Sequence, residues 1–284
     1  MPETVEIFEV GPRDGLQNEA RAIPTAAKIA LIDTLSQAGF RRIEVASFVS
    51  PKWVPQMADS GAVLAGITRA AGVRYAALVP NMQGYTAARA ARADEVAIFA
   101  SASEGFSRAN LNCTIAESLT RFAPVAAAAQ ADGMPLRGYV SCVTDCPFDG
   151  PTPPAAVARV VAALRDLGCY EVSLGDTIGQ GRPGTIAAML RAALDELPAD
   201  RLAGHYHDTG GQALANIEAS LVLGLRVFDA AVGGLGGCPY APGAPGNVAT
   251  EAVAARLAAL GLATGLDADV LARAAELARG LRGG

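Results

Sequence analysis

Short apolar runs rich in β-branched residues alternate along the chain with longer stretches rich in alanine and leucine. The short runs predict eight β-strands, at residues 5–10, 42–47, 74–79, 95–100, 136–143, 170–174, 202–207 and 227–232. The longer stretches predict helices at 24–38, 55–71, 81–92, 114–131, 153–167, 183–196, 209–223 and 247–261, and a last one at 267–281. Strands that are apolar on both faces and alternate with helices are typical of a parallel sheet.

Eight consecutive strand–helix units in a chain of 284 residues predict a closed α/β barrel of the TIM, or (β/α)8, type with an extra C-terminal helix. The alternative, an open doubly wound sheet, requires a glycine-rich phosphate-binding turn after its first strand. Here the first strand is followed by Gly11-Pro12-Arg13-Asp14-Gly15, which is not such a turn. No linker-like stretch divides the chain, so we expect a single catalytic domain over residues 1–284.

Composition narrows the function classes and the compartment. With 51% hydrophobic and 18% charged residues the chain is too apolar to be disordered, and no apolar run reaches the ~18 residues that cross a bilayer. A net charge of −5 argues against a nucleic-acid partner. Residues 1–10 lack the features of a signal peptide, and five cysteines are an odd number that favours free thiols. We therefore expect a cytoplasmic protein that binds neither membranes nor nucleic acids.

The only two histidines of the sequence give the strongest chemical signal. His205 and His207 lie two residues apart on a predicted strand, so both side chains point to the same face. Catalytic groups of this type of barrel come from the C-terminal ends of the strands, where two imidazoles can bind one divalent metal ion. Asp14, after the first strand, and Asn247, after the last, are expected to add oxygen ligands, a mixture that suits Mg²⁺ or Mn²⁺ as well as Zn²⁺.

Arg13 directly precedes Asp14 and allows two interpretations. It can form a structural ion pair with Glu44 or Asp176, or it can stabilise a developing oxyanion beside the metal. We favour the second interpretation because Arg13 lies at the catalytic end of the first strand. Glu44 is then expected to orient Arg13 or a metal ligand, and Asp176 to cap the next loop or to act as a base.

The segment 233–246 begins Gly-Gly-Leu-Gly-Gly-Cys-Pro, with four glycines among its first five residues. Such a segment is either mobile or sharply turned. Packing does not explain a thiol at its tip, whereas a lid that brings Cys238 over a metal site does. We therefore expect residues 233–246 to form a mobile lid.

Six segments together resemble 3-hydroxy-3-methylglutaryl-CoA lyases, in order, from about residue 5 to 261. The Arg-Asp motif and the His-x-His pair are shared with the wider superfamily of aldolase-like barrel lyases and synthases, whereas the loop around Cys238 is more specific to the lyases. The segments are Glu9–Glu19, Ser47–Pro51, Val140–Cys142 with Cys146-Pro147, Ser173–Gly179, His205–Thr209 and Gly233–Glu251.

The resemblance implies a homodimeric barrel that uses Mg²⁺ or Mn²⁺ and cleaves 3-hydroxy-3-methylglutaryl-CoA to acetyl-CoA and acetoacetate, late in leucine degradation. It implies Arg13 as the support of the enolate and Cys238 as a group that protonates the product. The implied metal ligands are Asp14, His205, His207 and Asn247, and Glu44 and Asp176 are implied as supporting polar residues.

The chemistry of this cleavage fits the residues independently. A metal that chelates the substrate hydroxyl lowers its pKa, and either His205 or Asp176 is a candidate to take its proton. Positions at or near the strand ends are further candidates for contacts with the acyl-CoA substrate: Arg13, Gln17, Ser47, Asn112 and Cys146. Lys52, Arg108 and Arg137 are cations that could meet the CoA phosphates, although no motif marks them.

Two departures from the family pattern leave the preferred acyl-CoA open. Gly211 stands where a tyrosine is expected, and Asp145 stands where a glycine commonly precedes Cys146. One alternative is therefore a lyase for a related 3-hydroxyacyl-CoA. A second is a condensing enzyme of the isopropylmalate-synthase type, although such enzymes usually carry further C-terminal regions and lack the Cys238 loop. A third is a catalytically silent barrel that binds metal or acyl-CoA, which the retention of Arg13, Asp14 and both histidines disfavours.

Overall fold

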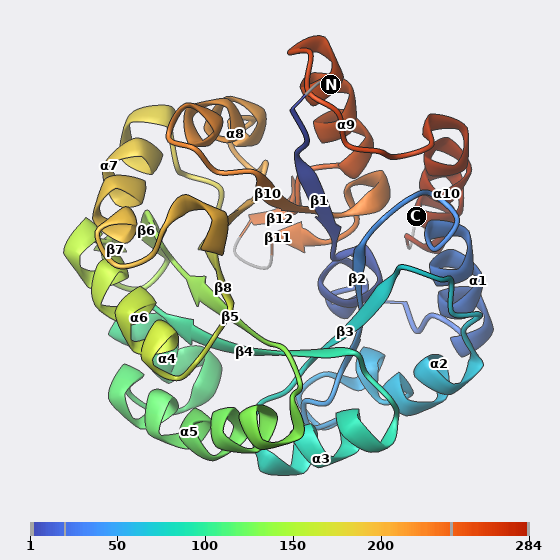
Figure 1. Cartoon of the computed structure of the whole chain (residues 1–284), viewed down its shortest axis with the longest axis horizontal. Coiled ribbons are helices and arrows are strands. Elements are labelled where there is room, and N and C mark those ends of the chain that lie inside the picture. The colour runs from blue at the N-terminus through green and yellow to red at the C-terminus, as the bar shows by residue number, and fades with distance from the viewer. Residues whose placement is uncertain (1–2, 20, 239–240, 283–284) are drawn as a thin grey trace.

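Eight parallel strands close into a barrel in the computed structural model, which describes residues 3–19, 21–238 and 241–282 (Figure 1). Around the barrel the strands follow the order β1-β10-β9-β8-β5-β4-β3-β2, and β1 also pairs with β2. The bounds are β1 (Glu6–Glu9), β2 (Arg42–Ser47), β3 (Arg74–Leu78), β4 (Glu95–Ser101), β5 (Leu136–Ser141), β8 (Glu171–Asp176), β9 (Leu202–Tyr206) and β10 (Val227–Ala230). The predicted (β/α)8 barrel is confirmed.

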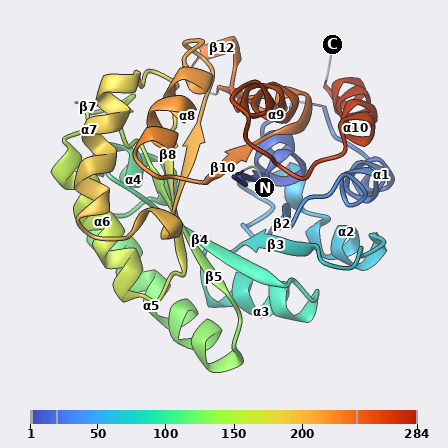
Figure 2. The same cartoon turned by 45° about the horizontal axis from the view of Figure 1, so that its top comes forward.

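Helices surround the strands on the outside, as Figures 1 and 2 show from two directions. The α-helices are α1 (Thr25–Leu35), α2 (Ser60–Gly66), α3 (Met82–Ala90), α4 (Glu104–Leu111), α5 (Ile115–Asp132), α6 (Pro154–Asp166), α7 (Pro183–Leu194), α8 (Ala213–Val222), α9 (Thr250–Ala259) and α10 (Ala268–Leu281). The short helical segments are η1 (Gly11–Gly15), η2 (Pro55–Met57), η3 (Ala199–Arg201) and η4 (Val232–Gly234). The expected extra C-terminal helix is α10, which Asp267 caps by accepting the N–H groups of Asp269 and Val270.

Two antiparallel hairpins interrupt the repeating units. β6 (Asp145–Cys146) pairs with β7 (Gly150–Pro151), and β11 (Gly237–Cys238) pairs with β12 (Ala241–Pro245). The sequence pattern predicts neither hairpin because each strand is too short to show an alternation. The second hairpin occupies most of the segment 233–246 that we expected to be a mobile lid; its mobility stays a prediction.

The apolar core lies between the strands and the outer helices. It is one cluster that takes residues from all eight barrel strands and from most helices, such as Ile43 on β2 and Leu190 on α7. Inside the barrel the apolar clusters are small, for example Phe8 with Val10 and Ala76. Buried charged side chains also lie in the interior, and these set up the functional site described below.

Two predicted helices differ in extent from the observed ones. The predicted helix 55–71 is divided into η2 and α2, and the hydroxyl of Ser60 fixes the break by donating to the carbonyls of Ser47 and Met57. The predicted helix 209–223 begins only at Ala213 because Gly211 has a φ of +67°, a left-handed conformation that ends a turn rather than continuing a helix. The helix α4 was not predicted.

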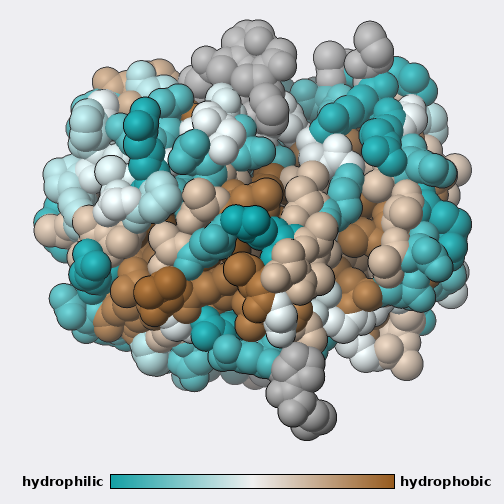
Figure 3. All heavy atoms as spheres, turned by 90° about the horizontal axis from the view of Figure 1, so that it is seen from above, coloured by the Kyte–Doolittle hydropathy of each residue, from teal (hydrophilic) through white to brown (hydrophobic). Residues whose placement is uncertain are grey.

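The outer surface is mixed in character. On the face shown in Figure 3, hydrophilic residues surround a band of hydrophobic ones. Among the described residues no helix combines the length and the apolar character needed to span a membrane.

Candidate active site

The Arg13-Asp14 motif lies on η1, a single turn of π-helix at the C-terminal end of β1. The carbonyl oxygen of Val10 accepts the N–H groups of Arg13, Asp14 and Gly15, at 3.2, 2.8 and 3.3 Å. Wide turns of this kind are frequent at functional sites. The turn projects two consecutive charged side chains into the mouth of the barrel.

Asp14, His205 and His207 come together at this mouth. Each offers one ligand atom, and the three atoms lie within 4.8 Å of one another. Nε2 of His205 lies 3.9 Å from Oδ2 of Asp14, and the centroids of the two imidazole rings are 5.5 Å apart. The two histidines therefore share a face, as their spacing predicts, and the carboxylate expected beside them is present.

Asn247 lies next to this group. Residue 247 forms an isolated antiparallel bridge with His207, and its Nδ2 donates to Oδ2 of Asp14 at 2.8 Å. All four residues predicted as metal ligands are thus brought together, although they come from three distant parts of the chain.

The protonation states of Asp14 and His207 suit a divalent cation. Burial raises the pKa of Asp14, but the Arg13 guanidinium and the two imidazoles outweigh it and lower the pKa to about 2, so the carboxylate is ionised. Burial and the neighbouring His205 lower the pKa of His207 to about 4, which keeps its imidazole neutral. Within the described part of the chain, Nδ1 of His207 is buried without a hydrogen-bond partner. A neutral imidazole with an unpartnered nitrogen beside a carboxylate is a donor set that fits a metal ion.

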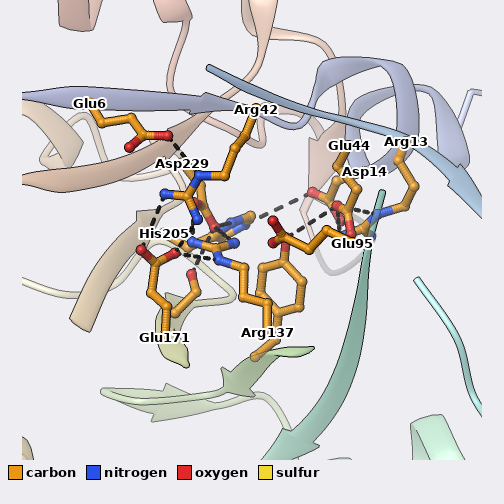
Figure 4. Close-up of polar contacts among 12 residues, drawn as sticks. Glu6, Arg13, Asp14, Arg42, Glu44, Glu95, Arg137, Glu171, His205 and Asp229 are labelled. Carbon is orange, nitrogen blue, oxygen red and sulfur yellow. Dashed lines mark hydrogen bonds and ion pairs between the residues drawn. The ribbon is translucent and has the colours of Figure 1, made fainter. Parts of the chain in front are cut away.

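Arg13 is held rigidly beside this group. Its Nε donates to Oε2 of Glu44 at 2.6 Å and its Nη1 to Oδ1 of Asp14 at 2.6 Å (Figure 4). The guanidinium also lies 5.6 Å from the centre of the Tyr139 ring. Burial alone would lower the pKa of Arg13, but the two carboxylates raise it well above its usual value. Arg13 therefore forms the ion pair with Glu44 that the sequence allows, and this ion pair holds a permanent cation at the mouth of the barrel.

Glu44 makes the contact with Arg13 that its predicted orienting role requires, and that role stays a prediction. Burial raises its pKa, against the opposing effect of Arg13. Its Oε2 also accepts the hydroxyl of Tyr139 at 3.2 Å, whereas Oε1 has no partner among the described residues.

Asp176, the last residue of β8, holds the loop that follows it. Its Oδ1 accepts the hydroxyl of Thr144 at 2.7 Å, and its Oδ2 accepts the N–H of Gly181 at 2.8 Å. These contacts are those of a loop-capping residue, and the described ion pairs of Arg13 are with Asp14 and Glu44 rather than Asp176. Its action as a base stays a prediction.

Two of the predicted substrate contacts have free polar atoms near the mouth. Ser47, at the end of β2, is buried, and its Oγ has no hydrogen-bond partner in the part of the chain described here. Ser47 lines a cavity of about 250 Å³ between the β2–α2 connection and the start of α3. The Oε1 of Gln17 is likewise buried without a described partner.

Asn112 and Cys146, which are also predicted to contact the substrate, lie outside the group of metal-ligating side chains. Asn112 ends α4 with a φ of 52°, a left-handed conformation that asparagine tolerates well, so its identity has a structural explanation. Cys146 is buried, and its Sγ accepts hydrogen bonds from Ser103 Oγ at 2.8 Å and from the N–H groups of Phe148 and Asp149. Their contact with substrate stays a prediction.

Cys238 belongs to β11, but its side chain lies outside the described part of the structure. The root of its hairpin sits directly on η1: a Cβ added to Gly15 would lie 2.6 Å from Cβ of Leu235, and one added to Gly236 would lie 3.2 Å from Cα of Gly15. Glycine at both positions allows the segment that carries Cys238 to begin against the turn that carries Asp14.

Asp229, which the sequence analysis does not single out, and Arg137, for which it suggests another role, also belong to the site. Figure 4 shows Asp229 beside His205, and the guanidinium of Arg137 also contacts Asp229. Both Arg137 and Asp229 are buried and form an ion pair of 2.7 Å, so the suggestion that Arg137 meets a CoA phosphate is wrong. A charged residue within an otherwise apolar strand was the available signal in both cases.

Taken together, the fold and the site define a (β/α)8-barrel enzyme with a carboxylate, two histidines and a fixed arginine at the C-terminal ends of its strands. The HMGL-like family model matches residues 4–278, and the chain belongs to this family.

Relatives and solved structures agree with this assignment. The chain is 56% identical to the 3-hydroxy-3-isohexenylglutaryl-CoA/hydroxy-methylglutaryl-CoA lyase of Pseudomonas aeruginosa, over 97% of this chain and 92% of that protein. The crystal structure of the HMG-CoA lyase from Brucella melitensis superposes with a TM-score of 0.98 at 65% identity, covering 99% of both chains. The structure of an HMG-CoA lyase from Acinetobacter baumannii in complex with coenzyme A and 3-methylmalate superposes with a TM-score of 0.93. It is 38% identical to this chain, and the match covers 98% of this chain and 91% of that one.

Proposed function

We propose that this protein cleaves 3-hydroxy-3-methylglutaryl-CoA to acetyl-CoA and acetoacetate. The observation that carries the proposal is the convergence of the Arg13–Glu44 pair with Asp14, His205 and His207 at one barrel mouth. The lyases named above resemble this chain over nearly its whole length, which supports the same reaction.

Asp14, His205 and His207 would hold a divalent metal ion, with Asn247 beside them as the fourth ligand. We propose Mg²⁺ or Mn²⁺, because oxygen and imidazole ligands without thiolate suit these ions. When bound, such an ion orients the substrate and lowers the pKa of its tertiary hydroxyl.

Arg13 has the geometry needed to stabilise the thioester enolate that cleavage produces. Its guanidinium is fixed by Glu44 and Asp14, so it needs little reorganisation when negative charge develops on the enolate oxygen. Its charge is permanent over the whole working pH range. Arg13 thus acts electrostatically and takes no part in proton transfer.

We assign protonation of the enolate carbon to Cys238 on the β11–β12 hairpin. The hairpin begins against Gly15, one residue after a metal ligand, which supports delivery of the thiol to the mouth when the segment closes. Closure of residues 233–246 as a lid would also exclude water from the enolate.

Ser47 and the cavity of about 250 Å³ beside it are proposed to receive part of the acyl-CoA chain. The buried Oγ of Ser47 has no partner among described residues, so a substrate carbonyl or amide would satisfy it. Gln17 offers a second free oxygen.

A related 3-hydroxyacyl-CoA is the second candidate substrate. The Pseudomonas aeruginosa relative is named for both an isohexenylglutaryl-CoA and hydroxy-methylglutaryl-CoA, and it is 56% identical to this chain. The two substrates differ in the size of the group at C3, so competition between them measures the preference directly.

We further propose that the protein works in the cytoplasm, in leucine degradation, as a homodimer. Free thiols at the four cysteines whose side chains are described agree with a reducing compartment. Sedimentation of the purified protein measures the oligomeric state, and fractionation of the source cells measures the compartment.

The experiment that tests the proposal is turnover of the purified protein on 3-hydroxy-3-methylglutaryl-CoA with Mg²⁺ or Mn²⁺, with and without EDTA, following acetoacetate. We expect cleavage that EDTA abolishes and added metal restores. Asp14→Asn should abolish turnover, whereas Asp208→Asn is a matched control, because Asp208 lies outside the metal-ligating group and accepts the N–H of Ala213. Metal binding without cleavage would move the proposal to another 3-hydroxyacyl-CoA, and absence of metal binding would overturn it.

A further inference from the structure

Asp229 lies in the barrel interior directly behind His205. The two residues are register partners on the adjacent strands β10 and β9, and both side chains point inward (Figure 4). Oδ2 of Asp229 is 3.1 Å from Nδ1 of His205 and accepts the hydroxyl of Ser173 at 2.7 Å. Asp229 thus touches a metal ligand on the side that faces away from the metal-ligating group.

Arg137 keeps Asp229 in its charged form. Its Nη2 donates to Oδ1 at 2.7 Å and its Nη1 to Oδ2 at 3.1 Å, a two-point contact that a carboxylate accepts and a neutral acid does not. An ionised carboxylate only accepts hydrogen bonds, so Nδ1 of His205 carries the proton.

The proton on Nδ1 decides what the other ring nitrogen can do. A neutral imidazole protonated at Nδ1 has its free electron pair on Nε2. Nε2 is the atom of His205 that faces Asp14, at 3.9 Å from Oδ2. The contact with Asp229 therefore presents an unprotonated nitrogen to the metal-ligating group and fixes the plane of the ring.

His207 provides an internal contrast. Its Nδ1 is buried without a hydrogen-bond partner in the described residues, so nothing comparable fixes its tautomer. The two histidines lie on the same face, but only His205 has a hydrogen-bond partner at Nδ1 among the described residues.

We propose that Asp229 is a positioning residue that fixes the tautomer and orientation of His205, and that Arg137 and Ser173 hold Asp229 in place for this purpose. The inference rests on the proposed metal site. Asp229, Arg137 and Ser173 thus orient a metal-ligating histidine in addition to packing the barrel interior.

Glu171 provides a matched control for the alternative that Asp229 only stabilises the fold through its ion pair with Arg137. Like Asp229 it is a buried carboxylate on a barrel strand, and Nε of Arg137 donates to its Oε1 at 2.6 Å. It also accepts both Nη atoms of Arg42. Among the described contacts it forms no hydrogen bond or ion pair with either histidine. Loss of Asp229 or Glu171 removes one carboxylate from Arg137, but only loss of Asp229 frees His205.

The test compares the wild-type protein with Asp229→Asn and Glu171→Gln, each as the full chain stripped of metal. Mn²⁺ affinity is measured by calorimetric titration and thermal unfolding by circular dichroism. We expect both variants to lower the melting temperature. We expect Asp229→Asn alone to weaken Mn²⁺ binding, by about 10- to 100-fold, since that is the usual effect of removing such a partner from a metal-ligating histidine. Equal Mn²⁺ affinity in all three proteins, or equal weakening in both variants, would overturn the proposal.

A second measurement needs no variant and no metal. Nitrogen-15 NMR of the wild-type protein, at a pH where imidazoles are neutral, reports which nitrogen of each histidine carries the proton. We expect the Nδ1–H form at His205, and the Nε2–H form there would refute the inference even if Asp229→Asn fails to fold. Failure of the wild-type protein to bind Mn²⁺ would instead count against the metal site, so the two failures are distinguishable.

Discussion

Glu9, at the end of β1, joins three segments of the barrel mouth, and its replacement by glutamine has a calculable effect. Its Oε1 accepts the N–H groups of Gly11 on η1 and Val232 on η4, at 2.8 and 2.9 Å. Its Oε2 accepts the hydroxyl of Thr250, the first residue of α9, at 2.6 Å. One buried carboxyl group thus connects the turn that carries Arg13 with the start of the segment that carries Cys238.

Burial raises the pKa of Glu9 from 4.5 to about 7, although its hydrogen bonds oppose the rise. Because the folded pKa lies above the unfolded one, the carboxyl group favours the fold fully below about pH 4.5. That contribution is lost as the pH rises through about 7. One pKa unit corresponds to about 1.36 kcal/mol, so the free energy of unfolding should lose roughly 3 kcal/mol over this window.

Urea unfolding of the wild-type protein and of Glu9→Gln, at about pH 5 and about pH 8, measures this loss. Glutamine does not ionise, so the variant lacks the contribution at both pH values. The wild-type free energy of unfolding should therefore fall relative to that of the variant by roughly 2.5 kcal/mol between the two pH values. Glu218→Gln, on α8, is the control for removal of a more exposed carboxylate. A constant difference between wild type and Glu9→Gln, within about 0.5 kcal/mol, would refute the reasoning.

Three further substitutions test the site itself. Glu44→Gln loosens the guanidinium of Arg13, so kcat should fall about 10- to 100-fold with little change in KM; an unchanged kcat would contradict this role. Ser47→Ala removes a hydroxyl without a described partner, so the free energy of unfolding should change by less than about 0.5 kcal/mol while KM rises several-fold; an unaltered KM would remove Ser47 from the substrate contacts. Cys238→Ala should reduce turnover strongly and leave metal affinity intact; normal turnover would show that another group protonates the product.

The barrel and the grouping of Asp14, His205 and His207 could be predicted from the sequence because both depend on local patterns. Strand and helix periodicity identified all eight strands of the barrel to within about two residues. The two-residue spacing of His205 and His207 places both side chains on one face of any strand, independently of the rest of the fold. Asp14 followed from the general rule that catalytic groups lie at the C-terminal ends of barrel strands.

Arg137 shows where that rule is insufficient. It lies on a predicted strand, but at the second residue, far from the C-terminal end. The choice between a solvent-facing cation and a buried one depends on which carboxylates lie across the barrel, and its partner Asp229 is 92 residues further along the chain. No local pattern contains this information, since it arises only when eight strands close with a particular register.

The same closure explains why the metal ligands alone do not describe the site. Arg42 and Arg137 each contact Glu171, and the series continues through Asp229 to His205 and, at 3.9 Å, to Asp14. Burying an unpaired charge would be strongly destabilising, so each member requires its neighbour to be ionised and correctly placed. A series of this kind permits few alternative arrangements of its last member, the imidazole that faces the mouth. In many such folds the barrel interior is filled with branched apolar side chains. Here it contains a series of charged side chains that ends at His205, which is why we propose that it orients this imidazole.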